Sequence, residues 1–147
     1  MKRLPSKAKA RGFLTVADFL EAGREELQLT LVAGEAALDR KVEEPIVSRP
    51  GLALTGFYEH FAWKRLQLIG KSETAYLNSL DDKTRFKRFK ALIERKAFCF
   101  VFTNGQQPRK EEVAIADEMG AVIMTTPLKT RVFASRSAVV IEGVLAP

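Results

Sequence analysis

Two hydrophobic patterns recur along the chain, one typical of buried strands and one typical of helices that cover a sheet. Near-continuous apolar runs at residues 97–102 and 121–125 predict parallel strands that are buried on both faces. A shorter run at residues 65–69 ends at Gly70 and predicts a third strand. Apolar residues at helical spacing predict helices at 72–80, 82–95, 108–120 and 130–141, the last compatible with a short strand at its end.

The order of these elements predicts the fold class. Residues 97–125 form one strand–helix–strand unit, and residues 66–102 form a second unit with two helices in its crossover. Consecutive units of this kind give a parallel sheet with right-handed crossovers. The predicted fold is therefore α/β, a three-layer sandwich with a mainly parallel sheet.

The N-terminal part of the chain carries weaker patterns. Residues 1–12 are basic and lack apolar periodicity, so we predict a flexible tail that precedes one domain at residues 13–147. Within that domain, Thr15 is the predicted N-cap of a helix that reaches about Glu26. A strand is predicted directly after this helix, at residues 27–32.

Residues 45–56 connect this N-terminal part to the strand–helix units. Pro50 fixes its own φ and Gly51 tolerates a positive φ, so the pair predicts a type II turn that displays Arg49 on a rigid elbow. Residues 56–63 then predict a short helix with an aromatic face. Three apolar side chains after the turn are predicted to enter the core: Leu52, Leu54 and Phe57.

Positive charge is concentrated in two segments. The formal net charge is +6 at pH 7; residues 1–11 contribute +5 and residues 83–96 contribute +6, which leaves −5 for the rest. An acidic body argues against a general nucleic-acid-binding surface. We expect the basic residues of segment 83–96 to form a solvent-exposed helix face, with docking to an acidic partner as the alternative.

Hydropathy and cysteine content narrow the class of protein. No apolar run approaches the roughly 18 residues that suggest a membrane-spanning helix, and no secretory signal follows the basic N-terminus. The single cysteine, Cys99, excludes an internal disulfide and lies in an apolar run, which predicts a buried core thiol. A cytoplasmic protein without a membrane partner is the simplest expectation.

The sequence contains no complete catalytic motif. Gly70-Lys71-Ser72 resembles the end of a phosphate-binding P-loop, but Arg65 stands where the motif requires its first glycine. The only histidine, His60, has no partner at the spacing of a metal site or a nucleophile–base pair. The paired carboxylates Glu43-Glu44 and Glu111-Glu112 are predicted to lie on the surface. We therefore predict no catalytic residue and no metal ligand in this chain.

A candidate ligand site lies where the predicted strands end. In open α/β sheets, the carboxyl ends of the strands host ligands. Basic and hydroxyl side chains gather there and on the elbow, and the candidate ligand-binding residues are Arg49, Lys71, Thr126, Thr130 and Arg131. These groups suit a phosphate or a carboxylate, whereas hydrogen bonding within loops and helix capping explain the hydroxyls equally well.

Three segments of the chain form a recognisable set. They read Val-Ser-Arg-Pro-Gly-Leu-Ala-Leu-Thr-Gly at 47–56, Arg-Leu-Gln-Leu-Ile-Gly-Lys-Ser-Glu at 65–73 and Thr-Thr-Pro-Leu-Lys-Thr-Arg at 125–131. In this order and spacing they resemble the N-terminal domain of bacterial HPr kinase/phosphorylase, and the first segment is the most specific. The resemblance covers about residues 13–147.

The resemblance implies a fold similar to the N-terminal domain of the MurE and MurF ligases. It implies that the full enzyme phosphorylates and dephosphorylates a serine of HPr, in carbon catabolite control of the sugar phosphotransferase system, and assembles as a hexamer. In that family the P-loop, ATP and Mg²⁺ belong to a C-terminal catalytic domain. This chain ends at Pro147, about where that domain would begin, so we expect no cofactor here.

Two functions are consistent with these observations. The first is a non-catalytic regulatory or assembly domain, whose partners would be its own C-terminal kinase domain, further copies of itself and HPr. The alternative is a stand-alone sensor domain that binds a small anionic metabolite or nucleotide. Nucleic-acid binding through residues 83–96 is a third and less favoured option, because the rest of the chain is acidic.

Overall fold

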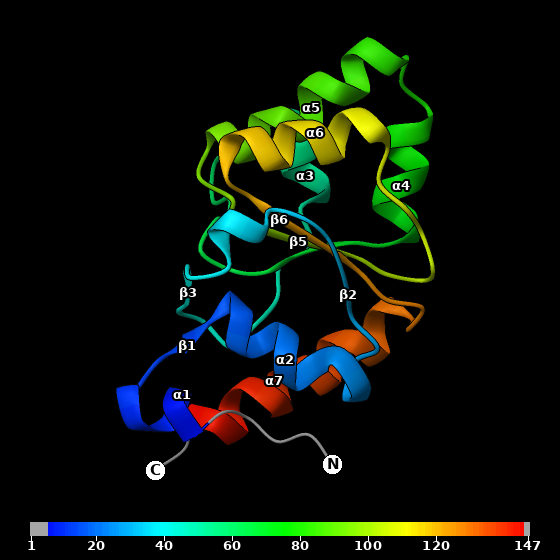
Figure 1. Cartoon of the computed structure of the whole chain (residues 1–147). Coiled ribbons are helices and arrows are strands. Elements are labelled where there is room, and N and C mark those ends of the chain that lie inside the picture. Colours follow the sequence, from blue (N-terminus) through cyan, green and yellow to red (C-terminus); the bar gives the residue numbers. More distant parts are fainter. Residues whose placement is uncertain (1–5, 146–147) are drawn as a thin grey trace.

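The computed structural model describes residues 6–145 (Figure 1). Within this range, no helix is both long enough and apolar enough to span a bilayer. The elements are α1 (Ser6–Arg11), β1 (Leu14–Thr15), α2 (Val16–Glu26), β2 (Thr30–Ala33), the 3₁₀ turn η1 (Glu35–Ala37), β3 (Lys41–Val42), α3 (Gly51–Leu54), β4 (Gln67–Ile69), α4 (Lys71–Asn78), α5 (Asp82–Glu94), β5 (Cys99–Phe102), α6 (Lys110–Met119), β6 (Val122–Thr125) and α7 (Thr130–Leu145).

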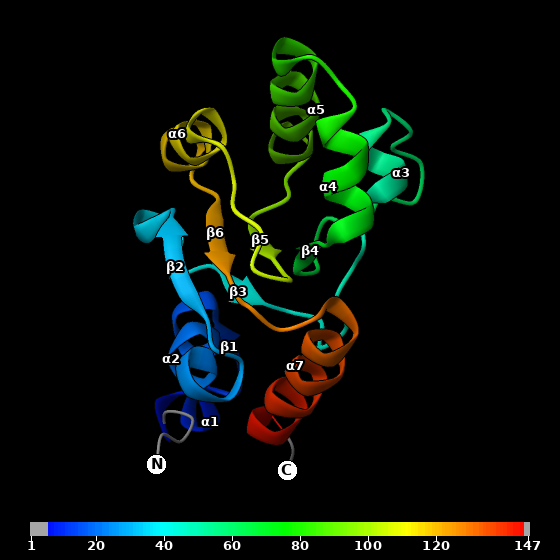
Figure 2. The same ribbon diagram turned by 90° about the vertical axis from the view of Figure 1, so that its right-hand side faces the viewer.

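A four-stranded sheet forms the middle of three layers. Its strand order is β2-β6-β5-β4; β4, β5 and β6 run parallel, and β2 pairs antiparallel with β6 at one edge. Helices α1, α2 and α7 lie on one side of the sheet, and α3, α4, α5 and α6 lie on the other (Figure 1 and Figure 2). The prediction of an α/β three-layer sandwich with a mainly parallel sheet is confirmed.

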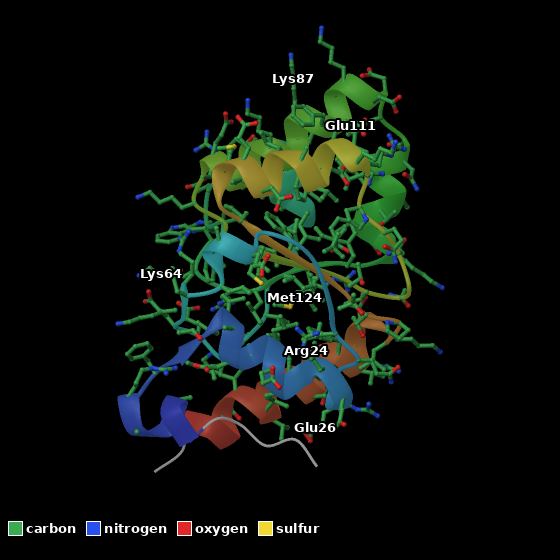
Figure 3. All side chains as sticks on the ribbon, viewed as in Figure 1. Arg24, Glu26, Lys64, Lys87, Glu111 and Met124 are labelled. Carbon is green, nitrogen blue, oxygen red and sulfur yellow. The ribbon has the colours of Figure 1, made fainter. Side chains whose placement is uncertain are left out.

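The sheet divides the core into two halves, because side chains alternate between the two faces of each strand. On β5, Cys99 and Val101 pack with residues of α2 and α7, whereas Phe100 and Phe102 pack with residues of α5 and α6. Met124 of β6 belongs to the first half and lies between the layers in Figure 3. Burial raises the pKa of the Cys99 thiol to about 12, and the prediction of a buried core cysteine is confirmed.

The N-terminal segment differs from the predicted flexible tail. Residues Ser6–Arg11 form α1, Ala8 is fully buried, and Arg11 forms an ion pair with Asp18 of α2. The sequence pattern missed this helix because the segment is short and its main packing partners are β1 and α7. Residues 1–5 lie outside the described residues, so the prediction for them stays a prediction.

The ends of three other elements test the sequence-based boundaries. Thr15 is confirmed as the N-cap of α2, since its hydroxyl accepts the N–H of Asp18 at 3.1 Å. Strand β2 begins only at Thr30, later than predicted, because Gln28 has a φ of 51° that interrupts an extended chain. Helix α7 continues to Leu145, which leaves no place for the short strand that the sequence allowed.

Pro50 and Gly51 open the short helix α3, so the predicted type II turn is wrong. Gly51 does not adopt the positive φ of such a turn, and the Pro50 carbonyl accepts the N–H of Leu54 at 2.9 Å. In a helix, residues two apart lie about 200° apart around the axis, so Leu54 is buried while Leu52 is 63% exposed. Phe57 is 49% exposed, and the prediction that Leu52 and Phe57 enter the core is also wrong.

Residues 56–63 form a series of turns rather than the predicted short helix. Gly56 and His60 have φ values of 99° and 68°, which an α-helix does not accommodate. The turns bring aromatic rings next to the C-terminal half of α5, and the rings that line a cavity there are Tyr58, Phe61 and Trp63.

A buried ion pair joins α5 to α6. The side chains of Arg85 and Glu112 are only 3% and 1% exposed. Arg85 Nε and Nη2 donate to the two carboxylate oxygens of Glu112 at 2.6 and 3.1 Å, and Nη1 donates to Asn78 Oδ1 at 2.6 Å. The predicted solvent exposure is therefore wrong for both Arg85 and Glu112, because each charge compensates the other inside the protein.

Candidate functional site

A cavity lies at the carboxyl ends of the parallel strands, where α4 and α7 begin. Strand β4 ends at Ile69, and Gly70 alone separates it from α4. The loop after β6 leads to Thr130, the first residue of α7. We call this feature the strand-end cavity; its volume is about 360 Å³, and it is lined by Arg49, Lys71, Ser72, Asn104, Lys129, Thr130, Arg131 and Val132.

Arg49 is fixed to α4 by a two-point ion pair. Its Nε and Nη2 donate to the carboxylate oxygens of Glu73 at 3.1 and 2.8 Å. The Glu73 side chain is 5% exposed, and one of its oxygens also accepts the N–H of Gly70 at 2.9 Å. The hydrogen bonds that Arg49 donates to Glu73 raise the pKa of Arg49 above its ordinary value. Arg49 therefore fixes the segment before α3 to the start of α4, and Glu73 balances its charge.

A polar cluster of Thr103, Asn104 and Thr130 lies at the strand-end cavity. The hydroxyl oxygens of Thr103 and Thr130 lie 2.6 Å apart, and Asn104 Nδ2 donates to Thr130 Oγ1 at 3.0 Å. Gly70 packs directly against this cluster, since a Cβ at that position would lie 2.5 Å from Thr130 Oγ1. Asn104 has a φ of 60°, a left-handed conformation that asparagine tolerates better than most residues. The cluster is thus a fixed set of hydrogen-bonding groups between β5 and α7.

Three basic side chains of the strand-end cavity carry uncompensated charge. Among the described residues, no carboxylate lies within ion-pair distance of Lys71, Lys129 or Arg131. The amino ends of α4 and α7 also meet here, and each contributes partial positive charge from its free N–H groups. The arrangement makes the cavity suitable for a small anion.

The sequence-based site residues are brought together with one exception. Arg49, Lys71, Thr130 and Arg131 all line the strand-end cavity. Thr126 does not line it: this residue is 1% exposed, and its hydroxyl donates to the Leu27 carbonyl at 2.7 Å and accepts the N–H of Leu128 at 3.2 Å. The side chains that the prediction omitted are Ser72, Asn104, Lys129 and Val132. The sequence did hold a signal for these side chains, because they lie next to predicted helix starts and to the end of a predicted strand.

Comparison with known proteins identifies relatives of this chain. The family model described as the HPr serine kinase N terminus matches residues 14–139. HPr kinase/phosphorylase from two Patoc 1 strains of Leptospira biflexa is 36% identical over 123 residues, which cover 84% of this chain and 38% of that protein. The chain thus spans less than half the length of these curated relatives.

A solved structure shares the fold. It is the crystal structure of the CBS and DRTGG domains of the regulatory region of Clostridium perfringens pyrophosphatase, in complex with the activator diadenosine tetraphosphate. The TM-score is 0.53 at 20% sequence identity, and the match covers 92% of this chain and 50% of that chain. The likeness concerns the fold alone. The family match over most of the chain and the similarity to HPr kinase/phosphorylase agree, and this chain belongs to the HPr serine kinase N-terminal domain family.

Proposed function

We propose that this chain is a non-catalytic regulatory and assembly domain of an HPr kinase/phosphorylase-type protein that acts in carbon catabolite control. The observation that carries the proposal is the match of residues 14–139 to a family described as the N terminus of the kinase. The junction at Gly70 supports it, because a P-loop needs several loop residues between strand and helix, and here there is one. We assign ATP and Mg²⁺ chemistry to another part of the whole protein.

The purified chain is expected to transfer no phosphate from Mg-ATP to HPr, because it holds no complete phosphate-binding loop. The measurement is a radiolabel or mass-spectrometric assay of serine phosphorylation, with full-length Leptospira biflexa HPr kinase/phosphorylase as the active control. Phosphorylation of HPr by the purified chain would contradict the proposal. The assembly role is read separately by analytical ultracentrifugation, where a species heavier than a monomer supports it and a monomer at all concentrations contradicts it.

A second candidate function is a sensor for a small anionic metabolite, because the strand-end cavity gathers uncompensated cations. Lys71, Lys129 and Arg131 have no carboxylate partner among the described residues, and two helix amino ends add to their field. The pyrophosphatase structure that shares the fold adds a parallel: it comes from a regulatory region and is in complex with an activator. Ligand binding here would not require any catalytic group.

Phosphorylated sugars are expected to raise the melting temperature of the chain if the strand-end cavity is a sensor site. A ligand present at about ten times its Kd adds roughly 1.4 kcal/mol to the free energy of unfolding. Arg131→Ala should abolish the shift, and Arg136→Ala, an exposed residue of α7 outside the cavity, should retain it. No shift at millimolar ligand would contradict the sensor function.

Arg131 is a better probe of this site than Arg49. Removal of Arg49 leaves Glu73 buried without its cationic partner, so Arg49→Ala is expected to lower stability as well as binding. Arg131 is exposed and makes no ion pair among the described residues, so Arg131→Ala changes the charge of the cavity and little else.

A further inference from the structure

A groove follows the outer side of α5, away from the strand-end cavity. Two neighbouring cavities of about 570 and 540 Å³ make up the groove and share Tyr58, Ala91 and Glu94. The first cavity lies at the C-terminal end of α5, shortly before β5 begins, and therefore at the amino ends of the parallel strands. We call the two cavities together the α5 groove; its other lining residues are Phe61, Trp63, Thr84, Lys87, Arg88, Lys90, Arg95 and Lys96.

Cations lie against aromatic rings in and beside the first cavity. The Arg95 guanidinium lies over the Tyr58 ring, 3.6 Å from its centroid. The ammonium groups of Lys64 and Lys96 each lie 5.5 Å from the centroid of Trp63. Arg95 is exposed, although its guanidinium is stacked on the Tyr58 ring. Aromatic rings and guanidinium planes are the surfaces on which nucleobases stack in proteins.

The second cavity supplies positive charge with little compensation. The Lys87 side chain makes no hydrogen bond or ion pair with any described residue, and Figure 3 shows it pointing away from the body of the domain. Lys90 reaches Glu94 only at 4.0 Å, and Arg88 donates to the Thr55 carbonyl at 2.8 Å, which leaves its charge unbalanced. Glu94 is the only carboxylate that lines the α5 groove in the described part of the chain. The groove therefore favours a ligand that carries several negative charges.

Lys96 occupies a backbone position that would suit glycine. Its φ is 82°, at the C-terminal end of α5, where the N–H of Lys96 bonds to the Ile93 carbonyl at 2.9 Å and the N–H of Ala97 bonds to the Leu92 carbonyl at 3.0 Å. This pair of bonds defines a Schellman motif, in which the left-handed residue is usually glycine. A lysine here costs conformational energy and places an ammonium group at the edge of the aromatic cavity, a combination that points to a functional side chain.

We propose that the α5 groove binds a nucleoside phosphate. The base stacks on the Tyr58–Arg95 pair and beside Trp63, the Glu94 carboxylate accepts hydrogen bonds from ribose hydroxyls, and the phosphates lie among the lysines. Each cavity has the volume of a small-molecule site. A long nucleic-acid strand fits less well, because the chain outside residues 1–11 and 83–96 is acidic. This site is distinct from the strand-end cavity and does not depend on the sensor function proposed for it.

Trp63 is the only tryptophan in the chain and provides a local signal for the test. ATP, GTP and UTP without Mg²⁺ are titrated against the chain, with inner-filter correction, and are expected to quench Trp63 fluorescence in a saturable manner. Inorganic tripolyphosphate, which has no base, is expected to bind more weakly and to leave the emission nearly unchanged. Isothermal titration calorimetry then gives the affinity for each variant.

Lys96→Gly is the decisive variant. It is expected to weaken nucleotide binding about tenfold, the effect of losing one hydrogen bond donated by the charged Lys96 ammonium group. The melting temperature is expected to rise, because glycine fits the left-handed backbone position of residue 96. Loss of binding together with a gain in stability cannot come from misfolding. Lys83→Ala is the matched control, because Lys83 is an exposed α5 residue outside the groove, and it should bind as tightly as the wild-type chain.

Four results would overturn the proposal. The first is the absence of quenching at millimolar nucleotide, and the second is equal nucleotide affinity of Lys96→Gly and Lys83→Ala. The third is abolition of the quenching by Arg131→Ala, which would assign the ligand to the strand-end cavity instead. The fourth is an oligothymidylate that binds at least a hundredfold more tightly than a mononucleotide and with a steep salt dependence, which would make the α5 groove a single-strand nucleic-acid site.

Discussion

Replacement of Arg85 by alanine is expected to lower the free energy of unfolding by about 3–5 kcal/mol, the usual cost of breaking a buried ion pair from one side. The substitution leaves the Glu112 carboxylate 1% exposed and without a cation. Asn78 loses its partner as well, since Arg85 Nη1 donates to its side-chain oxygen at 2.6 Å. Urea denaturation followed by circular dichroism measures the change.

Two further variants separate loss of the charge pair from loss of packing. Lys83→Ala removes an exposed basic residue from the same helix and should change stability by less than about 0.5 kcal/mol. The double variant Arg85→Met, Glu112→Leu removes both charges and should recover much of the loss, because no buried charge then lacks a partner. If Arg85→Ala costs less than about 1 kcal/mol, the pair is not a determinant of the α5–α6 contact.

The central strands and the helices between them were predictable because their signals are local. The run at 97–102 is apolar at every position, and this pattern alone identifies a strand that is buried on both faces. The antiparallel edge strand β2 was placed too early, because Gln28 lies in a left-handed conformation that its residue type does not announce. Local composition therefore predicts the existence of an element more reliably than it predicts the element's first residue.

Charged residues show where local reasoning fails. Arg85 and Glu112 are 27 positions apart, and each by itself resembles a surface residue. Their burial depends on the packing of α5 against α6, which neither segment encodes alone. Pro50 and Gly51 illustrate the same limit, since the dipeptide suits both a turn and a helix start, and the packing of Leu54 selects the helix.

The strand-end cavity was predictable in outline because of a topological rule. Parallel strands bring their carboxyl ends to one edge, so Lys71, Thr130 and Arg131 were expected to meet. Thr126 directly follows β6, but its hydroxyl donates to the Leu27 carbonyl instead of lining the cavity. The direction of a side chain in a loop depends on its tertiary hydrogen bonds, which sequence spacing does not reveal. The α5 groove was harder to foresee, because its rings come from turns that were predicted to be a helix.

Gly34→Ala is expected to destabilise the chain by at least about 3 kcal/mol, because two penalties act at one position. Gly34 has a φ of 87°, which costs energy for any residue with a Cβ. An added Cβ would also lie only 2.1 Å from the Ala121 carbonyl oxygen, a backbone atom that cannot rotate away. Relief of this contact would separate β2 from the start of β6 and weaken the bond from the Gly34 N–H to Asp117 Oδ1, now 2.7 Å long.

Gly105→Ala is the matched control for this substitution. Gly105 has a similar φ of 72°, but nothing lies within 4 Å of an added Cβ, so only the conformational cost of roughly 1–2 kcal/mol remains. The difference between the two variants in urea or guanidinium denaturation isolates the steric contact of Gly34 with Ala121. Equal losses would mean that β2 moves away from β6 without cost, and the antiparallel edge of the sheet would then be a flexible attachment rather than part of the cooperative core.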